Sequence, residues 1–152
     1  MKEIVFFLFI QKNKVLLQYT KGKSGKFEAV EVPHGDIEEK DRGKQHASER
    51  EHALHRLMYE QSQGTVIPLQ YEMVEMIDDK KKNERVYVFF IYSWDGDHPI
   101  YATSNKERIA RLRWLSVTEG LDAVTEVLDA KILKTAKEII RVRSVLHGRV
   151  YH

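Results

Sequence analysis

The sequence contains no cysteine, which excludes disulfide bonds, thiolate zinc sites and a cysteine nucleophile. It has only three prolines and eight glycines among 152 residues, so we expect ordered elements joined by short turns. The first apolar run, Ile4–Ile10, has seven residues, whereas a membrane span needs about 20. It also lacks the longer apolar core of a secretory signal. These features predict a cytoplasmic protein with no membrane partner.

The chain also has little net charge. It carries 25 basic and 23 acidic side chains, which leaves a formal charge of +2, and this balance argues against a nucleic-acid partner. Hydrophobic residues make up 42% of the chain and charged residues 32%, which is typical of a folded globular protein. The length predicts a single domain over residues 1–152, and the sequence leaves a homodimer open.

Alternating and apolar runs predict a sheet. The expected strands are Lys2–Ile10, Val15–Tyr19, Phe27–Val32, Thr65–Ile77, Arg85–Trp94 and Leu112–Leu115. The first of these strands is too apolar for a half-exposed position and should be central. Pro68 favours an edge strand or a bulge. Residues 36–44 and 100–110 are rich in polar side chains and are expected to be loops.

Helical periodicity follows from about Gln45 to Gln61, where Leu54, Leu57, Met58 and Gln61 form one packed face. Ser116 and Glu119 form a capping-box pattern that predicts a second helix. A last helix is expected over Asp129–Leu146. Strands joined by short turns, with helices between and after them, predict an α/β or α+β sandwich built on a mixed sheet.

The stretch from residue 32 to residue 66 carries the candidate chemistry, and it reads VPHGDIEEKDRGKQHASEREHALHRLMYEQSQGTV. Carboxylates crowd the predicted loop at positions 36, 38, 39 and 41, and others lie on the helix at 49, 51 and 60. Such oxygen ligands suit Mg²⁺, which can bridge phosphate oxygens while a P–O bond breaks. The alternative is a solvated acidic loop beside an ordinary amphipathic helix.

This order of strand, glycine turn, acidic loop, helix and terminating Gly64 resembles the Nudix hydrolase family, whose signature is G-x5-E-x7-R-E-U-x-E-E-x-G-U, with U aliphatic. The strand Val86–Trp94 and the segment RLRWLSVTE at 111–119 also resemble that family. The resemblance implies a Nudix-like α/β/α sandwich. It further implies a hydrolase of a small nucleotide substrate, which cleaves a diphosphate linkage in a nucleoside diphosphate derivative with Mg²⁺ or Mn²⁺.

The signature is degenerate in this chain. Pro33 and Gly35 match the family's Pro-Gly-Gly turn, and Asp41 falls at the Glu of G-x5-E. A spacer of thirteen residues, Arg42–Leu54, replaces the family's seven. His55 then takes the Arg position.

In the same alignment Arg56 takes the first Glu position, and Glu60 alone remains of the metal-binding pair. The resemblance implies that Glu60 binds metal, that Glu38 is a ligand or base, and that Arg56 clamps phosphate. Glu49 lies about 16 Å from Glu60 along the helix axis, so the two cannot share one ion. The alternative for Arg56 and Glu60 is a surface ion pair one helical turn apart.

Other residues complete the implied site. The metal set is Glu60 with Asp41 and Glu39 from the loop, and the backbone carbonyl near His34 is where the family supplies another ligand. Arg42 and Arg50 are the candidate substrate-binding residues. Glu107 is a further candidate base, and His34, His46, His52 and His55 receive no role.

Two rival hypotheses remain. Loss of most helix carboxylates favours a catalytically inactive Nudix-like module that binds nucleotides or has a regulatory role. Alternatively, the chain is an unrelated sandwich. An enzyme of the pyrophosphohydrolase type is favoured by the acidic loop together with Glu60.

Overall fold

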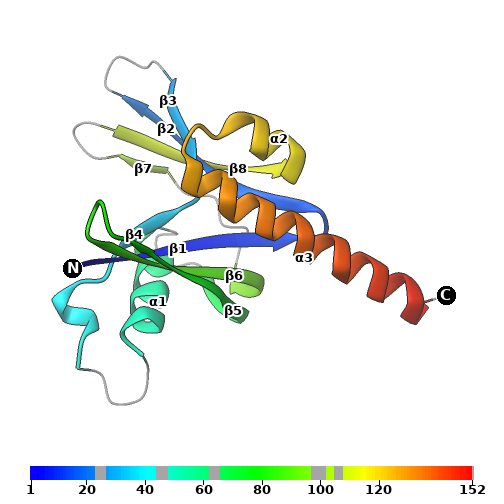
Figure 1. The fold of residues 1–152 in the computed structure, drawn as a ribbon, viewed down its shortest axis with the longest axis horizontal. Coiled ribbons are helices and arrows are strands. Elements are labelled where there is room, and N and C mark those ends of the chain that lie inside the picture. Colours follow the sequence, from blue (N-terminus) through cyan, green and yellow to red (C-terminus); the bar gives the residue numbers. More distant parts are fainter. Residues whose placement is uncertain (23–26, 44–47, 62–65, 97–101, 105–107, 152) are drawn as a thin grey trace.

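A computed structural model describes residues 1–22, 27–43, 48–61, 66–96, 102–104 and 108–151. The strands are β1 (Lys2–Gln11), β2 (Lys14–Gly22), β3 (Phe27–Glu31), β4 (His34–Asp36), β5 (Val66–Asp79), β6 (Glu84–Gly96), β7 (Ala102–Ser104) and β8 (Arg108–Ser116). The helices are the 3-10 turn η1 (Glu39–Asp41) and the α-helices α1 (Glu49–Gln61), α2 (Val117–Ala123) and α3 (Val127–Tyr151). Figure 1 shows their arrangement.

The strands form a mixed sheet in the order β5-β6-β1-β2-β8-β7, with β3 paired to β2 and β4 paired to β1. The pair β1–β6 is parallel, and the other pairs are antiparallel. The strand β1 pairs with three others, which confirms its predicted central place. The hairpin of β1 and β2 is also as predicted, with Ile10 opposite Val15.

The centre of the sheet is apolar on both faces because successive side chains of β1 point to opposite sides. Ile4, Phe6, Leu8 and Ile10 enter one core, and Val5, Phe7 and Phe9 enter the other. The neighbouring strand β6 divides its side chains in the same way. A strand buried on both faces needs the continuous apolar run that the sequence has.

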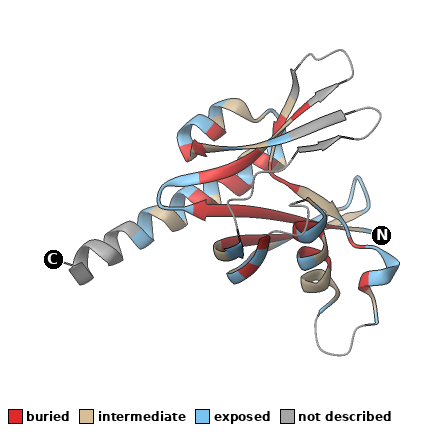
Figure 2. Cartoon of the chain, turned by 180° about the vertical axis from the view of Figure 1, so that it is seen from behind, coloured by how far each residue is buried: buried red, intermediate tan, exposed pale blue. Residues whose placement is uncertain are grey.

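Helices cover the two faces. The helix α1 packs on one core through Ala53, Leu54, Leu57 and Met58. The helix α3 packs on the other core through Ile132, Leu133 and Ala136. Figure 2 shows buried residues concentrated along the central strands and the helix faces turned toward them. This layering is the predicted α/β/α sandwich.

Several local predictions are confirmed. The strand β5 is an edge strand, and its pairing with β6 shifts register after Pro68. Ser116 caps α2: its side chain accepts a hydrogen bond from the Glu119 N–H, and the Glu119 side chain accepts one from the Ser116 N–H.

Other boundaries were wrong. The range 100–110 contains β7 and the start of β8, since β7 pairs with β8 and β8 pairs with β2. The predicted loop at 36–44 begins with the last residue of β4 and includes the turn η1. The helix α1 begins at Glu49, whereas the predicted start was near Gln45. Gln45 and the predicted terminating residue Gly64 lie outside the described residues. The helix α3 extends beyond the predicted range at both ends. In the described part of the chain, no helix is both long and apolar enough to cross a membrane.

Candidate functional site

The candidate site lies where β4 and η1 meet α1. Gly35 in β4 allows the helix to approach closely, because a Cβ atom added there would lie 2.3 Å from Leu57 Cδ2. The turn η1 is closed by two reciprocal hydrogen bonds: the Asp41 N–H donates to the Glu38 carbonyl, and the Glu38 N–H donates to Asp41 Oδ2. These contacts hold the acidic loop against the helix.

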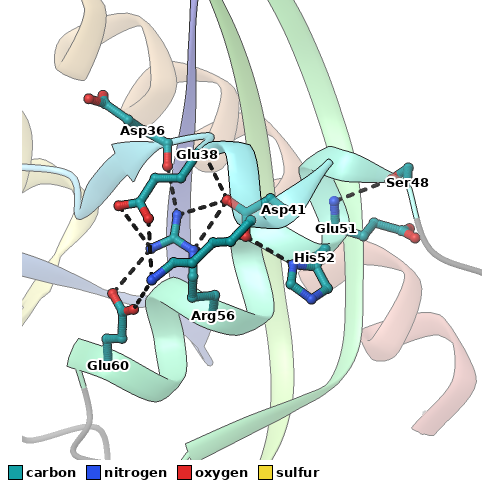
Figure 3. Close-up of polar contacts among 9 residues, drawn as sticks. Asp36, Glu38, Asp41, Ser48, Glu51, His52, Arg56 and Glu60 are labelled. Carbon is teal, nitrogen blue, oxygen red and sulfur yellow. Dashed lines mark hydrogen bonds and ion pairs between the residues drawn. The ribbon is translucent and has the colours of Figure 1, made fainter. Parts of the chain in front are cut away.

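Asp41 is fully buried at the centre of a polar network (Figure 3). Arg56 Nε donates to Asp41 Oδ1 over 2.9 Å, and Arg56 Nη2 donates to Oδ2 over 3.0 Å. His52 Nδ1 lies 2.9 Å from Oδ1. Burial alone would raise the pKa of Asp41, but the bonds from Arg56, the Glu38 N–H and His52 lower it to about 2. The side chain is therefore an ionised carboxylate with a complete set of partners.

Arg56 is the residue through which the loop and the helix are joined. Its side chain is 10% exposed, and Nη2 also donates to the Asp36 carbonyl over 2.7 Å. Burial alone would lower the pKa of Arg56, but its bonds to Asp41 and the nearby glutamates raise it. Its guanidinium is thus fixed in place, with Nη1 directed at the glutamates.

Glu38 from the loop and Glu60 from α1 converge, with two cations between them. Arg56 Nη1 lies 3.7 Å from Glu38 Oε1 and 3.1 Å from Glu60 Oε2. Lys40 Nζ lies 3.3 Å from Glu38 Oε2 and 3.4 Å from Glu60 Oε1. We call Glu38, Lys40, Arg56 and Glu60 the charged ring. Each carboxylate uses one oxygen for each cation.

The remaining predicted residues lie outside this ring. The Glu39 side chain is 96% exposed and lies 3.6 Å from Arg42 Nε. Arg42 Nη1 also pairs with Glu3 and Glu49, so it ties the loop to β1 and to the start of α1. The guanidinium of Arg50 lies 5.3 Å from the centre of the Tyr87 ring. Among the described residues, neither arginine contacts Glu38 or Glu60.

The described residues contain no group of three or more His, Asp or Glu side chains placed to hold a metal ion together. Both oxygens of Asp41 are already bonded, which argues against Asp41 as a ligand. Among the described residues, Glu39 does not contact the ring, and the exposure of its side chain also argues against it as a metal ligand. Glu38 and Glu60 are the carboxylates that the fold brings together.

The Asp41–Arg56 pair changes the alignment with the Nudix signature. His55 contacts the Tyr71 hydroxyl, whereas Arg56 bonds Asp41, and a revised alignment that assigns Arg56 to the Arg position brings that position into contact with the residue at the Glu of G-x5-E. Fourteen residues then separate Asp41 from Arg56. Leu57 takes the first Glu position, and Glu60 and Gln61 take the pair. The helix keeps one of the three glutamates of the signature.

Sequence reasoning missed three participants. Lys40 and His52 are ordinary charged or polar residues in sequence, and only the fold shows what they contact. Gln61 Nε2 donates to the His34 carbonyl over 3.4 Å, while its Oε1 is buried without a partner among the described residues. Helical spacing could have found His52, which lies one turn before Arg56 on the same face.

Of the remaining candidates, His34 lies apart from this network, and two others are not among the described residues. The His34 ring stacks on Phe6 with 4.6 Å between centroids, and its Nδ1 bonds the Val32 carbonyl. On that face of the sheet, His34 lines a cavity of about 350 Å³ together with the buried Asp129 at the start of α3. His46 and Glu107 lie outside the described residues.

Comparison with known proteins establishes the fold. The sequence matches no family model and no curated protein. Among solved structures, MutT, studied from Aliivibrio salmonicida and Vibrio cholerae, has a TM-score of 0.65 at 13% identity, covering 90% of this chain and 97% of that one. An ADP compounds hydrolase has a TM-score of 0.66 at 10% identity, covering 93% and 74%.

The ORF135 protein of E. coli has a TM-score of 0.63 at 18% identity, covering 88% of this chain and 86% of that one. These neighbours are all Nudix or MutT-type hydrolases. The chain therefore has a Nudix-like fold, as the sequence resemblance implies. At these identities the likeness establishes the fold, and activity has to be argued from the site.

Proposed function

We propose that this protein is a hydrolase that cleaves a diphosphate linkage in a nucleoside diphosphate derivative with the help of Mg²⁺ or Mn²⁺. The observation that carries the proposal is the convergence of Glu38 and Glu60, which come from separate segments. The fold neighbours support it, since one is named a hydrolase of ADP compounds. The substrate would be a small nucleotide derivative.

The donor set fits a metal that arrives with its substrate. Mg²⁺ is usually held by one or two carboxylates together with substrate phosphates and water, and seldom by an all-protein cage. Glu38 and Glu60 supply two carboxylates. The buried Gln61 Oε1 lacks a partner among the described residues, and a cation near the His34 carbonyl would give it one. All of these ligands are the hard oxygens that Mg²⁺ and Mn²⁺ prefer.

The protein's own groups would have distinct roles in the reaction. Glu60 would bind the metal ion, and Glu38 would be a second ligand or the base that takes a proton from the attacking water. Arg56, held by Asp41 and the Asp36 carbonyl, would direct Nη1 at a phosphate oxygen without reorganising. A bound divalent ion would neutralise charge on the phosphate oxygens as the P–O bond breaks.

Arg42 and Arg50 have lesser support as phosphate-binding residues. Arg42 is paired with three carboxylates, which offsets its charge. Arg50 lies over the Tyr87 ring and has no ion pair among the described residues, so it is the freer of the two. We keep both as candidates for the outer part of the substrate site.

The second candidate function is a nucleotide-binding module without catalysis. Two observations favour it. Leu57 and Gln61 stand where the revised alignment expects glutamates, and Lys40 and Arg56 already neutralise the two carboxylates that remain. Such a site would bind phosphates weakly and leave the anhydride intact.

Phosphorus NMR separates the two candidates. The protein is mixed with Mg²⁺ or Mn²⁺ and with nucleoside triphosphates, ADP-ribose or dinucleoside polyphosphates. Turnover that disappears in Glu60→Gln and in Glu38→Gln supports the hydrolase. Glu51→Gln is the matched control, because Glu51 lies on the same helix and points away from the ring in Figure 3. Binding without turnover supports the module, and turnover unchanged in Glu60→Gln rejects the proposed site.

A further inference from the structure

The charged ring contains two cations that are held very differently. Arg56 is 10% exposed and bonds both oxygens of the buried Asp41 as well as the Asp36 carbonyl. The Lys40 side chain is 58% exposed. Among the described residues, it contacts only Glu38 and Glu60, at 3.3 and 3.4 Å. Arg56 is therefore a fixed member of the ring, and Lys40 is one that can leave.

Removal of Lys40 from the ring would need no backbone movement. Its main chain belongs to η1, which is closed by the reciprocal bonds between Glu38 and Asp41. The ammonium is carried on a flexible four-carbon stem. Exposed ion pairs of this kind contribute little to stability, so the side chain can swing into solvent while the two carboxylates keep their places.

The balance of charges in the ring explains when the Lys40 side chain would move out of it. Two carboxylates and two cations make the ring neutral, so a divalent ion has to compete with Lys40 for the same oxygens. Together with the ionised Asp41 that pairs with Arg56, these groups carry a net charge of −1, and a divalent ion in place of the ammonium brings it to zero. Loss of that negative charge favours a bound phosphate, and a bound phosphate in turn favours the ion, because coupling between two ligands is reciprocal.

We propose that Lys40 is a built-in counter-cation that keeps a divalent metal ion away from Glu38 and Glu60 until a phosphate-bearing ligand binds with it. This inference rests on the proposed function, since it concerns the same metal position. It adds a residue at a position that the Nudix signature leaves unspecified, and an order of events. The metal and the phosphate bind together, and each alone binds weakly.

Metal binding tests this directly. Mn²⁺ binding is measured by electron paramagnetic resonance and by calorimetry on the full chain, with and without inorganic pyrophosphate. We expect Lys40→Met to raise the affinity for Mn²⁺ alone about tenfold. Pyrophosphate should raise the Mn²⁺ affinity of the wild type by a larger factor than that of the variant. Lys131→Met is the control, since Lys131 pairs with Glu75 away from the ring.

The outcomes separate this inference from the proposed function. An unchanged Mn²⁺ affinity in Lys40→Met, or no Mn²⁺ binding by either protein, overturns the role of Lys40. If the affinity rises as expected but no substrate is hydrolysed, the counter-cation role stands and the hydrolase proposal fails. If substrates are hydrolysed while the affinity does not change, the hydrolase stands and the counter-cation role fails. Thermal melting of Lys40→Met shows whether the variant is folded.

Discussion

Two buried aspartates, one beside each helical layer, have opposite electrostatic environments. Asp41 lies against α1 and is 0% exposed, and Asp129 lies at the start of α3 and is 3% exposed. The pKa of Asp41 is lowered to about 2, whereas burial raises the pKa of Asp129 to about 6. Both side chains are shielded from solvent, yet their pKa values shift in opposite directions.

The difference lies in the partners. Asp41 receives bonds from Arg56, His52 and the Glu38 N–H. Asp129 has one hydrogen bond within the described chain, from the Val32 N–H at 3.2 Å. Burial penalises a charge, and only hydrogen bonds or opposite charges offset that penalty. The surroundings of Asp41 therefore stabilise a buried negative charge, and those of Asp129 do not.

The largest expected effect comes from removing the charge of Asp41. Asp41→Asn leaves the guanidinium of Arg56 without its buried partner, and we expect a loss of about 3 kcal/mol in the free energy of unfolding at pH 7. Urea denaturation measures it. Because the pKa of Asp41 is lowered, its stabilising contribution is present above its usual value of 3.8 and is lost as the pH falls toward 2.

The control for this change is Asp78→Asn, which removes a carboxylate from an exposed pair with Arg85. Its urea midpoint should stay close to that of the wild type. Equal losses in the two variants would mean that burial of Asp41 adds nothing to its pairing with Arg56, and the comparison between the aspartates would then break down.

Asp129→Asn should raise the free energy of unfolding, whereas Asp41→Asn lowers it. The amide oxygen can still accept the Val32 N–H, but no charge is buried. The raised pKa means that the folded wild type binds a proton more readily than the unfolded chain between pH 3.8 and about 6. Wild-type stability therefore falls as the pH rises through this window and remains lower above it. We expect Asp129→Asn to be more stable by about 2 kcal/mol at pH 8.

The same variant provides its own control at low pH. At pH 4 Asp129 is largely protonated in the folded wild type, so the gain from Asp129→Asn should shrink toward zero. Urea midpoints measured from pH 4 to pH 8 for both proteins reveal this trend. If the gain in stability of Asp129→Asn is independent of pH, or if the variant is less stable than the wild type at pH 8, the ionised Asp129 does not destabilise the folded protein.

Much of the fold could be predicted because it depends on local pattern. The apolar run of β1 indicated a central strand, Pro68 indicated an edge, and the Ser116–Glu119 pair indicated a helix start. The strand β7 and the first part of β8 could not be predicted in this way. Their residues show no clear alternation of apolar and polar side chains, and their strand structure comes from the pairing of β7 with β8 and of β8 with the distant β2.

The candidate site was partly predictable for a similar reason. Helical spacing put Glu60 one turn beyond Arg56, and it could also have put His52 on the same face. It could not reveal that Asp41 is the shared partner of His52 and Arg56, since the distance between the loop and the helix depends on tertiary packing, including the close approach at Gly35. The place of Lys40 between two glutamates depends on the same packing.

The smallest expected effect concerns a single partner of Asp41. An ionised carboxylate can only accept, so His52 Nδ1 carries the proton that it shares with Asp41 Oδ1. His55, on the same helix, bonds the neutral Tyr71 hydroxyl at 3.2 Å. Hydrogen bonds to charged groups contribute more than neutral ones, so His52→Ala should cost about 1 kcal/mol more than His55→Ala.

Comparing two His→Ala changes on one helix cancels the difference in helix propensity. A double-mutant cycle in urea between His52→Ala and Asp41→Asn then isolates the contact itself, because the cycle removes each partner alone and both together. If the coupling energy is near zero, His52 does not stabilise the ionised Asp41, and the bonds from Arg56 and the Glu38 N–H are sufficient to do so. A clear coupling would instead mean that all three donors are needed to distinguish Asp41 from Asp129.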